Sequence, residues 1–191
     1  MTARSRPRPG PQPGSTYRSA EVIKHLLVTS TIRLLDEGVA VSHLSARSVT
    51  DRAGVDKMYV NRFFGNLDHL LLAVVEHLLS VRMRSLISSD VFVTGAVDSN
   101  VIHAFRIFVF LANNEDMQPE LHLLGQLVVD VYSAQMREEF GLNADEAVRE
   151  AVVGLMWMVG YLSVGHLLAL PPEEVVGWMN LRREQLRRPG S

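Results

Sequence analysis

The sequence predicts an all-α protein. Apolar side chains recur three and four residues apart in several long blocks, which is the spacing of one face of a helix. Helix stop signals, either glycine or a pair of prolines, separate these blocks, and capping residues such as Ser45 and Asn143 precede several of them. A content of 47% apolar residues in a chain of 191 can fill the core of one or two domains.

Residues 1–18 are predicted to form a disordered basic arm. They alternate arginine with proline, glycine and serine, and they contain a single aromatic residue. They lack the apolar segment of a secretory signal. Such an arm can bind phosphates without sequence preference or reach a minor groove; the alternative is a solvated tail without a role.

Residues 19–66 are predicted to form a three-helix domain whose first helix is the longest. This helix begins near Ser19, and its buried face includes Ile23 and Leu27. Gly38 ends it, because glycine adopts the left-handed backbone conformation that commonly follows a helix.

Residues 45–64 are predicted to form two short helices joined by a tight turn. Ser45 is a good N-cap for the first helix, and Gly54 ends it. Asp56 caps the second helix, which is expected to begin at Lys57. This is the shape of a DNA-reading helix-turn-helix, although an ordinary helical hairpin has the same pattern.

Residues 67–191 are predicted to form a larger helical domain. A long helix begins after Asn66, and a connection over residues 89–99 follows it. The next block, NVIHAFRIFVFLANN, is helical by length, and its three phenylalanines predict a helix that is buried all round. Another helix has Pro119 in its first turn and ends at Gly141.

The second half of this domain contains a long uncharged run. Asn143 and Glu146 predict a capping box that starts a helix, and residues 151–170 of its continuation carry no full charge. Twenty such residues are long enough to span a membrane, so that alternative is open. The charged start and the internal His166 favour instead a helix that protein covers on both sides. This helix and a last helix, which ends before residue 187, are expected to form a dimer interface.

Positive charge is concentrated at the N-terminal end. Residues 1–66 contain ten Lys and Arg against five Asp and Glu, a net +5, and residues 67–191 contain nine against sixteen, a net −7. The two parts sum to the formal charge of −2. The basic end is therefore expected to face a polyanion such as nucleic acid.

Three motifs follow one another between Val22 and Leu79. They are the helix EVIKHLLVTSTIRLLDEG, the stretch SVTDRAGVD, and a group formed by Phe64, Asn66, Asp68 and Leu70. Together they resemble, without a gap, the N-terminal domain of the TetR family of transcriptional regulators, whose fourth helix begins with an aromatic-x-Ser-Lys-Glu-x-Leu motif. The resemblance implies a cytoplasmic homodimer that binds double-stranded operator DNA.

The resemblance also implies a repressor that a small-molecule effector, largely apolar, releases from its operator. Residues of the two short helices and their caps are expected to touch the DNA: Ser45, Arg47, Thr50, Lys57, Met58, Tyr59, Asn61 and Arg62. Aromatic, soft and polar groups of the C-terminal domain are the candidate ligand-binding residues: Phe105, Phe108, His122, Gln126, Met156, Trp157 and Tyr161.

Several residues depart from the family pattern in the DNA-binding region. Met58 stands where the family usually has glycine, Asn61 replaces its tyrosine, Phe63 its histidine and Leu67 its lysine. The tyrosine and the lysine contact phosphates in the family. The sequence therefore leaves an alternative, a helical dimeric sensor or interaction protein with weakened DNA binding.

Catalysis and metal binding find little support in the sequence. The chain has no cysteine, which excludes disulfides, thiol catalysis and thiolate metal sites. It contains no GxSxG, P-loop, GxGxxG or HExxH motif, and its seven histidines are scattered without metal-ligand spacing. We therefore expect no enzyme activity, no catalytic or metal site and no cofactor.

Overall fold

The computed structural model describes residues 19–86, 99–164, 177, 181, 182 and 184–186, and every regular element within them is helical. The prediction of an all-α fold is confirmed. The elements are α1 (Ala20–Asp36), η1 (Val41–His43), α2 (Ala46–Ala53), α3 (Met58–Phe64), α4 (Leu67–Leu86), α5 (Ser99–Leu111), η2 (Glu115–Met117), α6 (Gln118–Phe140) and α7 (Ala144–Val164), where η marks a short 3₁₀ helix. The predicted arm 1–18, most of the connection 89–99, and His166 with most of the last helix lie outside the described residues.

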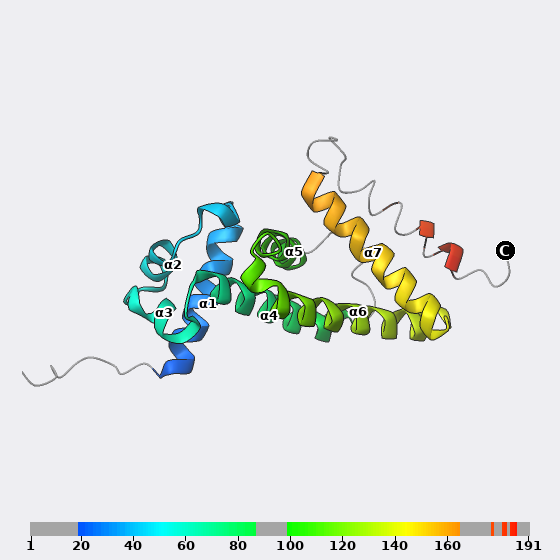
Figure 1. The fold of residues 1–191 in the computed structure, drawn as a ribbon, viewed down its shortest axis with the longest axis horizontal. Helices are drawn as coiled ribbons and strands as arrows, with labels where there is room; N and C mark the ends of the chain where they lie inside the picture. Colours follow the sequence, from blue (N-terminus) through cyan, green and yellow to red (C-terminus); the bar gives the residue numbers. More distant parts are fainter. Residues whose placement is uncertain (1–18, 87–98, 165–176, 178–180, 183, 187–191) are drawn as a thin grey trace, which may run out of the picture.

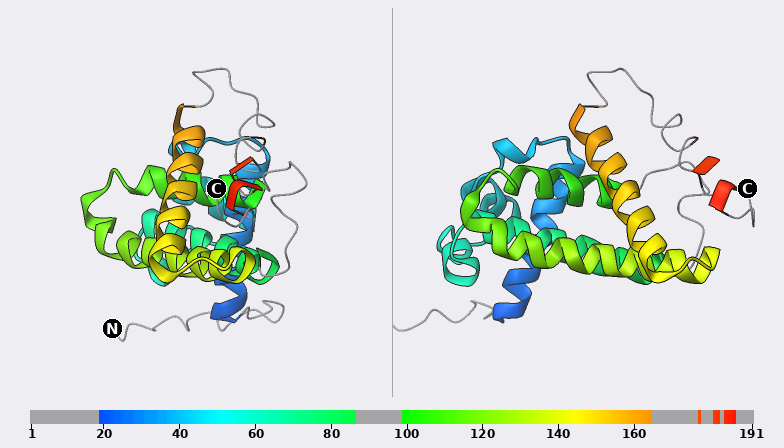
Figure 2. Two further views of the ribbon diagram at one scale, coloured as in Figure 1. Left: turned by 90° about the vertical axis from the view of Figure 1, so that its right-hand side faces the viewer. Right: turned by 45° about the vertical axis from the view of Figure 1, so that its right-hand side comes forward.

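The helices form an elongated molecule with the short ones at one end. Figure 1 shows α1, α2 and α3 together at that end and α7 at the other, with α4 and α5 between them. Helix α4 packs against both α1 and α5, and α7 packs against α6 and α5. The two further views in Figure 2 show α7 crossing α6 at a steep angle. Helices α4 and α5 therefore connect the N-terminal helices to the rest of the chain.

The turn between α2 and α3 forms as the sequence predicts. The Ser45 hydroxyl accepts a hydrogen bond from the Ser48 backbone N–H at 3.1 Å, and the Ser48 hydroxyl accepts one from the Ser45 N–H at 3.0 Å. This reciprocal pair is a capping box in which serine replaces the usual Glu or Gln. At the other end of α2, Gly54 has a φ of +63°, which explains why glycine is needed there.

The start of α3 differs from the prediction by one residue. The helix begins at Met58 rather than Lys57, although Lys57 already has a right-handed helical backbone. The Asp56 carboxylate nevertheless accepts a hydrogen bond from the Met58 N–H at 2.8 Å, which is the expected capping contact. The capping residue was therefore predicted correctly.

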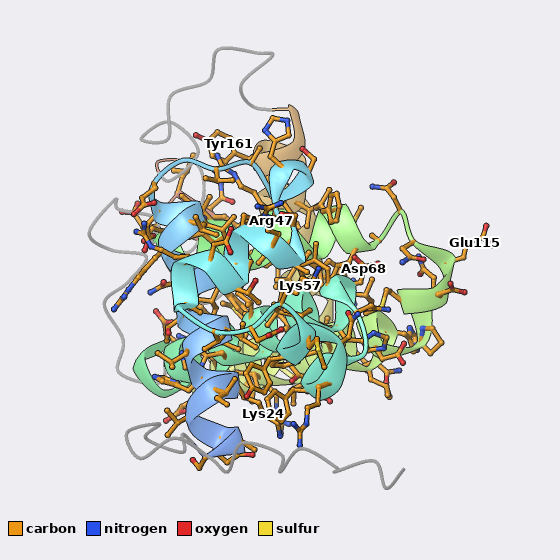
Figure 3. The ribbon with its side chains drawn as sticks, turned by 90° about the vertical axis from the view of Figure 1, so that its left-hand side faces the viewer. Lys24, Arg47, Lys57, Asp68, Glu115 and Tyr161 are labelled. Carbon is orange, nitrogen blue, oxygen red and sulfur yellow. The ribbon has the colours of Figure 1, made fainter. Side chains whose placement is uncertain are left out.

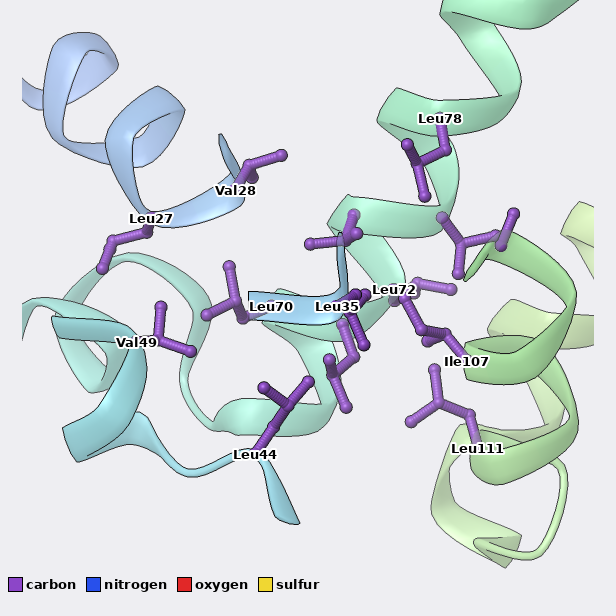
Figure 4. Close-up of a cluster of buried hydrophobic side chains, with 14 of the residues drawn as sticks. Leu27, Val28, Leu35, Leu44, Val49, Leu70, Leu72, Leu78, Ile107 and Leu111 are labelled. Atoms are coloured by element: carbon purple, nitrogen blue, oxygen red, sulfur yellow. The ribbon is translucent and has the colours of Figure 1, made fainter. Parts of the chain in front are cut away.

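One hydrophobic cluster joins the N-terminal helices to α4, α5 and α6. Val49 and Val60 contribute the buried faces of α2 and α3, and Leu27 contributes that of α1. Figure 4 shows the buried side chains of α1 and α2 next to the leucines of α4, and Ile107 of α5 on the other side of α4. Because α2 and α3 are too short to be stable alone, this burial fixes where their exposed faces lie.

The remaining helix boundaries follow the predicted caps. The Asn66 side chain accepts a hydrogen bond from the His69 N–H at 2.9 Å at the start of α4. Gly141, with a φ of +67°, ends α6. The Asn143 and Glu146 side chains each accept a hydrogen bond from the other residue's N–H, at 3.0 and 3.1 Å. The predicted capping box of α7 is therefore present.

One burial prediction was wrong, and the other, that protein covers both sides of residues 151–170 in a dimer, stays a prediction. Helix α5 is not buried all round, because Phe110 is 38% exposed and Arg106 is exposed as well. Helix α7 packs against α6 and α5 on one side, but its other side exposes large apolar groups such as Val153 and Trp157. In both helices a run of apolar residues is wider than the face that the fold covers.

Within the described part of the chain, no helix is long and apolar enough to cross a membrane.

Arg182 lies beside α7, since its guanidinium donates to both oxygens of the Glu150 carboxylate, with Nε 3.1 Å from Oε2. This contact raises the pKa of Arg182 above its ordinary value.

Candidate functional site

Most of the residues expected to touch DNA are exposed on α2, α3 and their caps. Ser45, Arg47, Lys57, Asn61 and Arg62 are exposed, and Met58 is 67% exposed at the first position of α3. Figure 3 looks onto this end of the molecule, with Arg47 on α2 and Lys57 before α3 both in view. These side chains could therefore reach a partner that approaches this end.

Thr50 does not belong to this exposed set. Its side chain is buried, with a residue exposure of 1%, and its hydroxyl donates to the backbone oxygen of Ala46 at 2.8 Å. The sequence pattern placed Thr50 among the polar residues of α2, but the turn of the helix directs it into the core. We therefore remove it from the candidate DNA contacts.

Aromatic stacking holds the side chains of α3 in place. The Tyr59 and Phe63 rings stack with their centroids 5.4 Å apart and an angle of 9° between their planes. The Arg62 guanidinium lies over the Phe63 ring, 5.7 Å from its centroid. Phe63, which stands where the TetR family usually has histidine, therefore contacts two of the candidate DNA-binding residues; no pattern in the sequence predicted this role.

The described residues at this end carry little net charge. Six Lys and Arg against five Asp and Glu in residues 19–66 leave +1, so four of the five excess charges of the N-terminal end belong to the arm. Arg47 also has the Asp51 carboxylate nearby, with Nε 3.6 Å from Oδ2. Lys24 and Arg52 also lie within 4 Å of an acidic side chain. The other cations of residues 19–66 are all exposed: Arg33 on α1, and Lys57 and Arg62 at α3.

A cavity of about 480 Å³, called the inner cavity below, lies between α4, α5, α6 and α7. It is partly open to solvent, since Val152 and Met156 in its lining are 38% and 68% exposed. Its lining residues are aliphatic, aromatic, thioether or glycine: Val75, Leu79, Ala104, Phe105, Phe108, Gly125, Val128, Val129, Val152, Leu155, Met156, Val159 and Gly160. No titratable side chain is among them. The volume falls in the range of small-molecule sites, and the lining suits an apolar group.

A second, more polar groove of about 660 Å³ adjoins the inner cavity. Phe108, Gly125 and Val129 line both spaces. The groove is also lined by His122 and Gln126, which lie one turn apart and hydrogen-bond to each other at 3.1 Å between Nε2 atoms. Both side chains are exposed rather than buried, so the groove faces solvent.

The seven candidate ligand-binding residues thus divide into three groups. Phe105, Phe108 and Met156 line the inner cavity, and His122 and Gln126, with Phe108, line the outer groove. Trp157 and Tyr161 line neither of these two spaces. Sequence reasoning missed the valines and glycines of the lining, because small apolar residues give no signal that separates a cavity wall from a filled core.

Two polar contacts connect the N-terminal helices to α5 and the segment after it. His103 of α5 is 6% exposed, and its Nε2 lies 3.0 Å from a carboxylate oxygen of Asp36 at the end of α1. The Asn114 amide donates to the Asp68 carboxylate in the first turn of α4 at 2.8 Å. The first contact joins α1 to α5, and the second joins α4 to the segment after α5; the sequence analysis predicted neither.

The described residues contain no group of three or more His, Asp or Glu side chains arranged to hold a metal ion. The buried hydroxyls of Thr31 and Ser133 donate to nearby backbone oxygens.

Comparison with known proteins identifies the fold and not the family. No protein-family model matches the chain, and no curated protein matches it. The crystal structure of a candidate transcriptional regulator from Pseudomonas aeruginosa PAO1 superposes with a TM-score of 0.57 at 20% sequence identity, over 90% of this chain and 93% of that chain. The two chains therefore share a helical fold along nearly their whole lengths.

Proposed function

We propose that this chain is a TetR-like, ligand-responsive transcriptional regulator that binds operator DNA as a homodimer. The observation that carries the proposal is the exposed α3 behind a glycine turn, with Lys57, Asn61 and Arg62 directed away from a core that holds Val60. A short helix presented in this way can enter a major groove, where cationic and amide groups bind phosphates and base edges. The regulator of similar fold supports the same class.

The proposed division of the chain follows from this arrangement. Residues 19–66 would bind DNA, residues 1–18 would add phosphate contacts, and residues 67–191 would bind the effector and form the dimer. The exposed apolar groups of α7, among them Val148 and Val153, support a dimer because they are 43% and 42% exposed in the single chain. A two-fold dimer would place two recognition helices about 34 Å or more apart along DNA. Light scattering on the purified chain tests the dimer directly.

The proposed mechanism is differential binding. An effector in the inner cavity would stabilise a dimer whose recognition helices are wrongly spaced for the operator. Linkage then requires DNA to weaken effector binding by the same factor. Repression rather than activation is inferred from the family resemblance, and a reporter assay in a deletion strain distinguishes the two.

The first test is a titration of the full chain against the intergenic DNA flanking its own gene, at about 50 and 200 mM salt. A regulator should prefer this DNA over random duplex, and its affinity should fall steeply with salt. No preference over random duplex at either salt concentration would refute operator binding.

Equal binding to the intergenic DNA and to random duplex would support the alternative, a helical dimeric sensor or interaction protein with weakened DNA binding. The observation that favours the alternative is the net charge of only +1 in residues 19–66, together with the loss of two phosphate-contacting residue types at Asn61 and Leu67.

A second test uses Lys57→Ala and Arg62→Ala. Each should weaken operator binding by about 1 to 3 kcal/mol, or roughly five- to 150-fold, and a lost phosphate contact should lower the salt slope by about one. Thermal unfolding should barely change, because both side chains are exposed. Arg106→Ala, which removes an exposed cation from α5, is the matched control and should bind DNA normally. If both α3 variants also bind normally, α3 does not read the DNA.

A further inference from the structure

We infer that the inner cavity and the outer groove together bind one amphiphile, with an apolar chain or ring inside and a cationic head group at the Asp130 end of the groove. The inference rests on the proposed ligand-responsive function, and it specifies the chemical class of the effector. It follows from the arrangement of α6 between the two spaces, the charges that line them, and the shared wall at Gly125.

Helix α6 presents two adjacent ridges of different polarity. Gln118, His122, Gln126 and Asp130 follow one another at intervals of four residues, and all four line the outer groove. An apolar ridge beside them runs through Gly125 and Val129 to the inner cavity. Because residues four apart stack along one side of a helix, a ligand lying across α6 meets both chemistries at once.

Gly125 opens the wall between the two spaces. It lines both, and a methyl group added at its Cα would come only 3.9 Å from Phe108 Cζ, an ordinary van der Waals distance. A side chain longer than this methyl group, such as that of leucine, would occupy the space between the inner cavity and the groove. The absence of a side chain at Gly125 therefore lets one molecule extend from the inner cavity into the groove.

The charges favour a cation over an anion. Among the described residues that line either space, Asp130 is the only one with a formal charge. The described lining of the groove holds no Lys or Arg to pair with a carboxylate or phosphate, whereas the Phe108 ring can face a cation. Residues 67–191 carry a net charge of −7, so the electrostatic potential around the two spaces also favours a cationic ligand.

The test compares three ligands with the same octyl chain by isothermal titration calorimetry on the full chain without DNA. Octyltrimethylammonium should bind tightest, 1-octanol about two- to fivefold more weakly, and octanoate weakest, with each ligand kept below its micelle concentration. Shortening the ammonium ligand to hexyl and butyl should weaken binding about fourfold for each methylene removed, because the chain is buried in the inner cavity.

Two pairs of variants separate the parts of the inference. Gly125→Leu should weaken octyltrimethylammonium binding at least tenfold, while Gly154→Leu, at a glycine of α7 that lines neither space, should bind within about twofold of the wild type. Both replace a helix glycine by a better helix former, so neither should lose stability through the backbone. Asp130→Asn should remove the preference for the ammonium ligand over the alcohol, and Glu76→Gln, at an exposed carboxylate on α4, should keep it.

Each outcome decides one part. Octanoate binding as tightly as the ammonium ligand would overturn the cationic head group. Unchanged binding by Gly125→Leu would overturn the single ligand spanning both spaces, and no binding by any of the three ligands would overturn the site. Since no DNA is present, a failure here is distinct from a failure of operator binding, which the intergenic DNA titration measures.

Discussion

The contact between Asp36 and His103 gives a prediction about how α1 is held against α5. Asp36→Ala removes the partner of a buried imidazole whose Nε2 lies 3.0 Å from the carboxylate. The other ring nitrogen, Nδ1, is buried and has no hydrogen-bond partner, so the variant would leave the ring with none. Leaving a buried polar group unsatisfied costs about 1 to 3 kcal/mol.

A smaller effect has the opposite sign. Asp36 is the last residue of α1, where a negative charge is unfavourable beside the C-terminal end of the helix dipole. Removing that charge stabilises the helix by about 0.3 to 1 kcal/mol. The Asp36 side chain is half-exposed, so little burial is lost with it. We therefore expect a net destabilisation of about 1 to 2 kcal/mol.

The assay is thermal unfolding followed by circular dichroism at one protein concentration. For a chain of this size the melting temperature should fall by roughly 2 to 8 °C, from about 2 to 4 °C per kcal/mol. The comparison needs four proteins: wild type, Asp36→Ala, His103→Leu and the double variant. In the His103→Leu background, Asp36→Ala should be neutral or slightly stabilising, because only the dipole effect remains.

Two results would refute this reasoning. If Asp36→Ala leaves the wild-type melting temperature unchanged, the carboxylate does not satisfy the imidazole. If Asp36→Ala costs the same with and without His103, the effect belongs to α1 alone and the contact does not join α1 to α5.

The other predictions concern the turn and the buried threonine. Gly54→Ala should destabilise the chain by about 1 to 2 kcal/mol, because alanine is strained at a φ of +63° although the space around it is empty. The same change at Gly125, inside α6, should stabilise by up to about 1 kcal/mol, and equal effects at the two sites in chemical denaturation would contradict the backbone argument. Thr50→Val should leave operator affinity unchanged in the DNA titration, since the Thr50 hydroxyl is buried; a loss comparable to that of Arg62→Ala would return Thr50 to the DNA surface.

Local features of this fold could be predicted because local chemistry controls them. Gly54 and Gly141 end helices in the left-handed conformation that glycine favours, and Ser45, Asp56 and Asn66 cap the helices that follow them. Each of these contacts joins residues a few positions apart, so no knowledge of the rest of the chain was needed.

The candidate sites were predicted less completely because their members come from separate helices. The inner cavity needs α4, α5, α6 and α7 to leave a space, and a valine beside a cavity looks the same in sequence as a valine in a filled core. Thr50 was misplaced for a related reason, because a polar side chain on a short helix can bond to its own backbone and turn inward.

The sequence by itself determined the all-α class, the first residues of the described helices to within about a residue, and the two short helices with their glycine turn. Helix periodicity, caps and stop residues act over a few positions, so they are written directly in the chain. Only the tertiary structure decided which faces stay exposed, that Asp36 meets His103, and that Gly125 lines both the inner cavity and the outer groove. These features depend on how helices distant in sequence pack against one another, which no local pattern specifies.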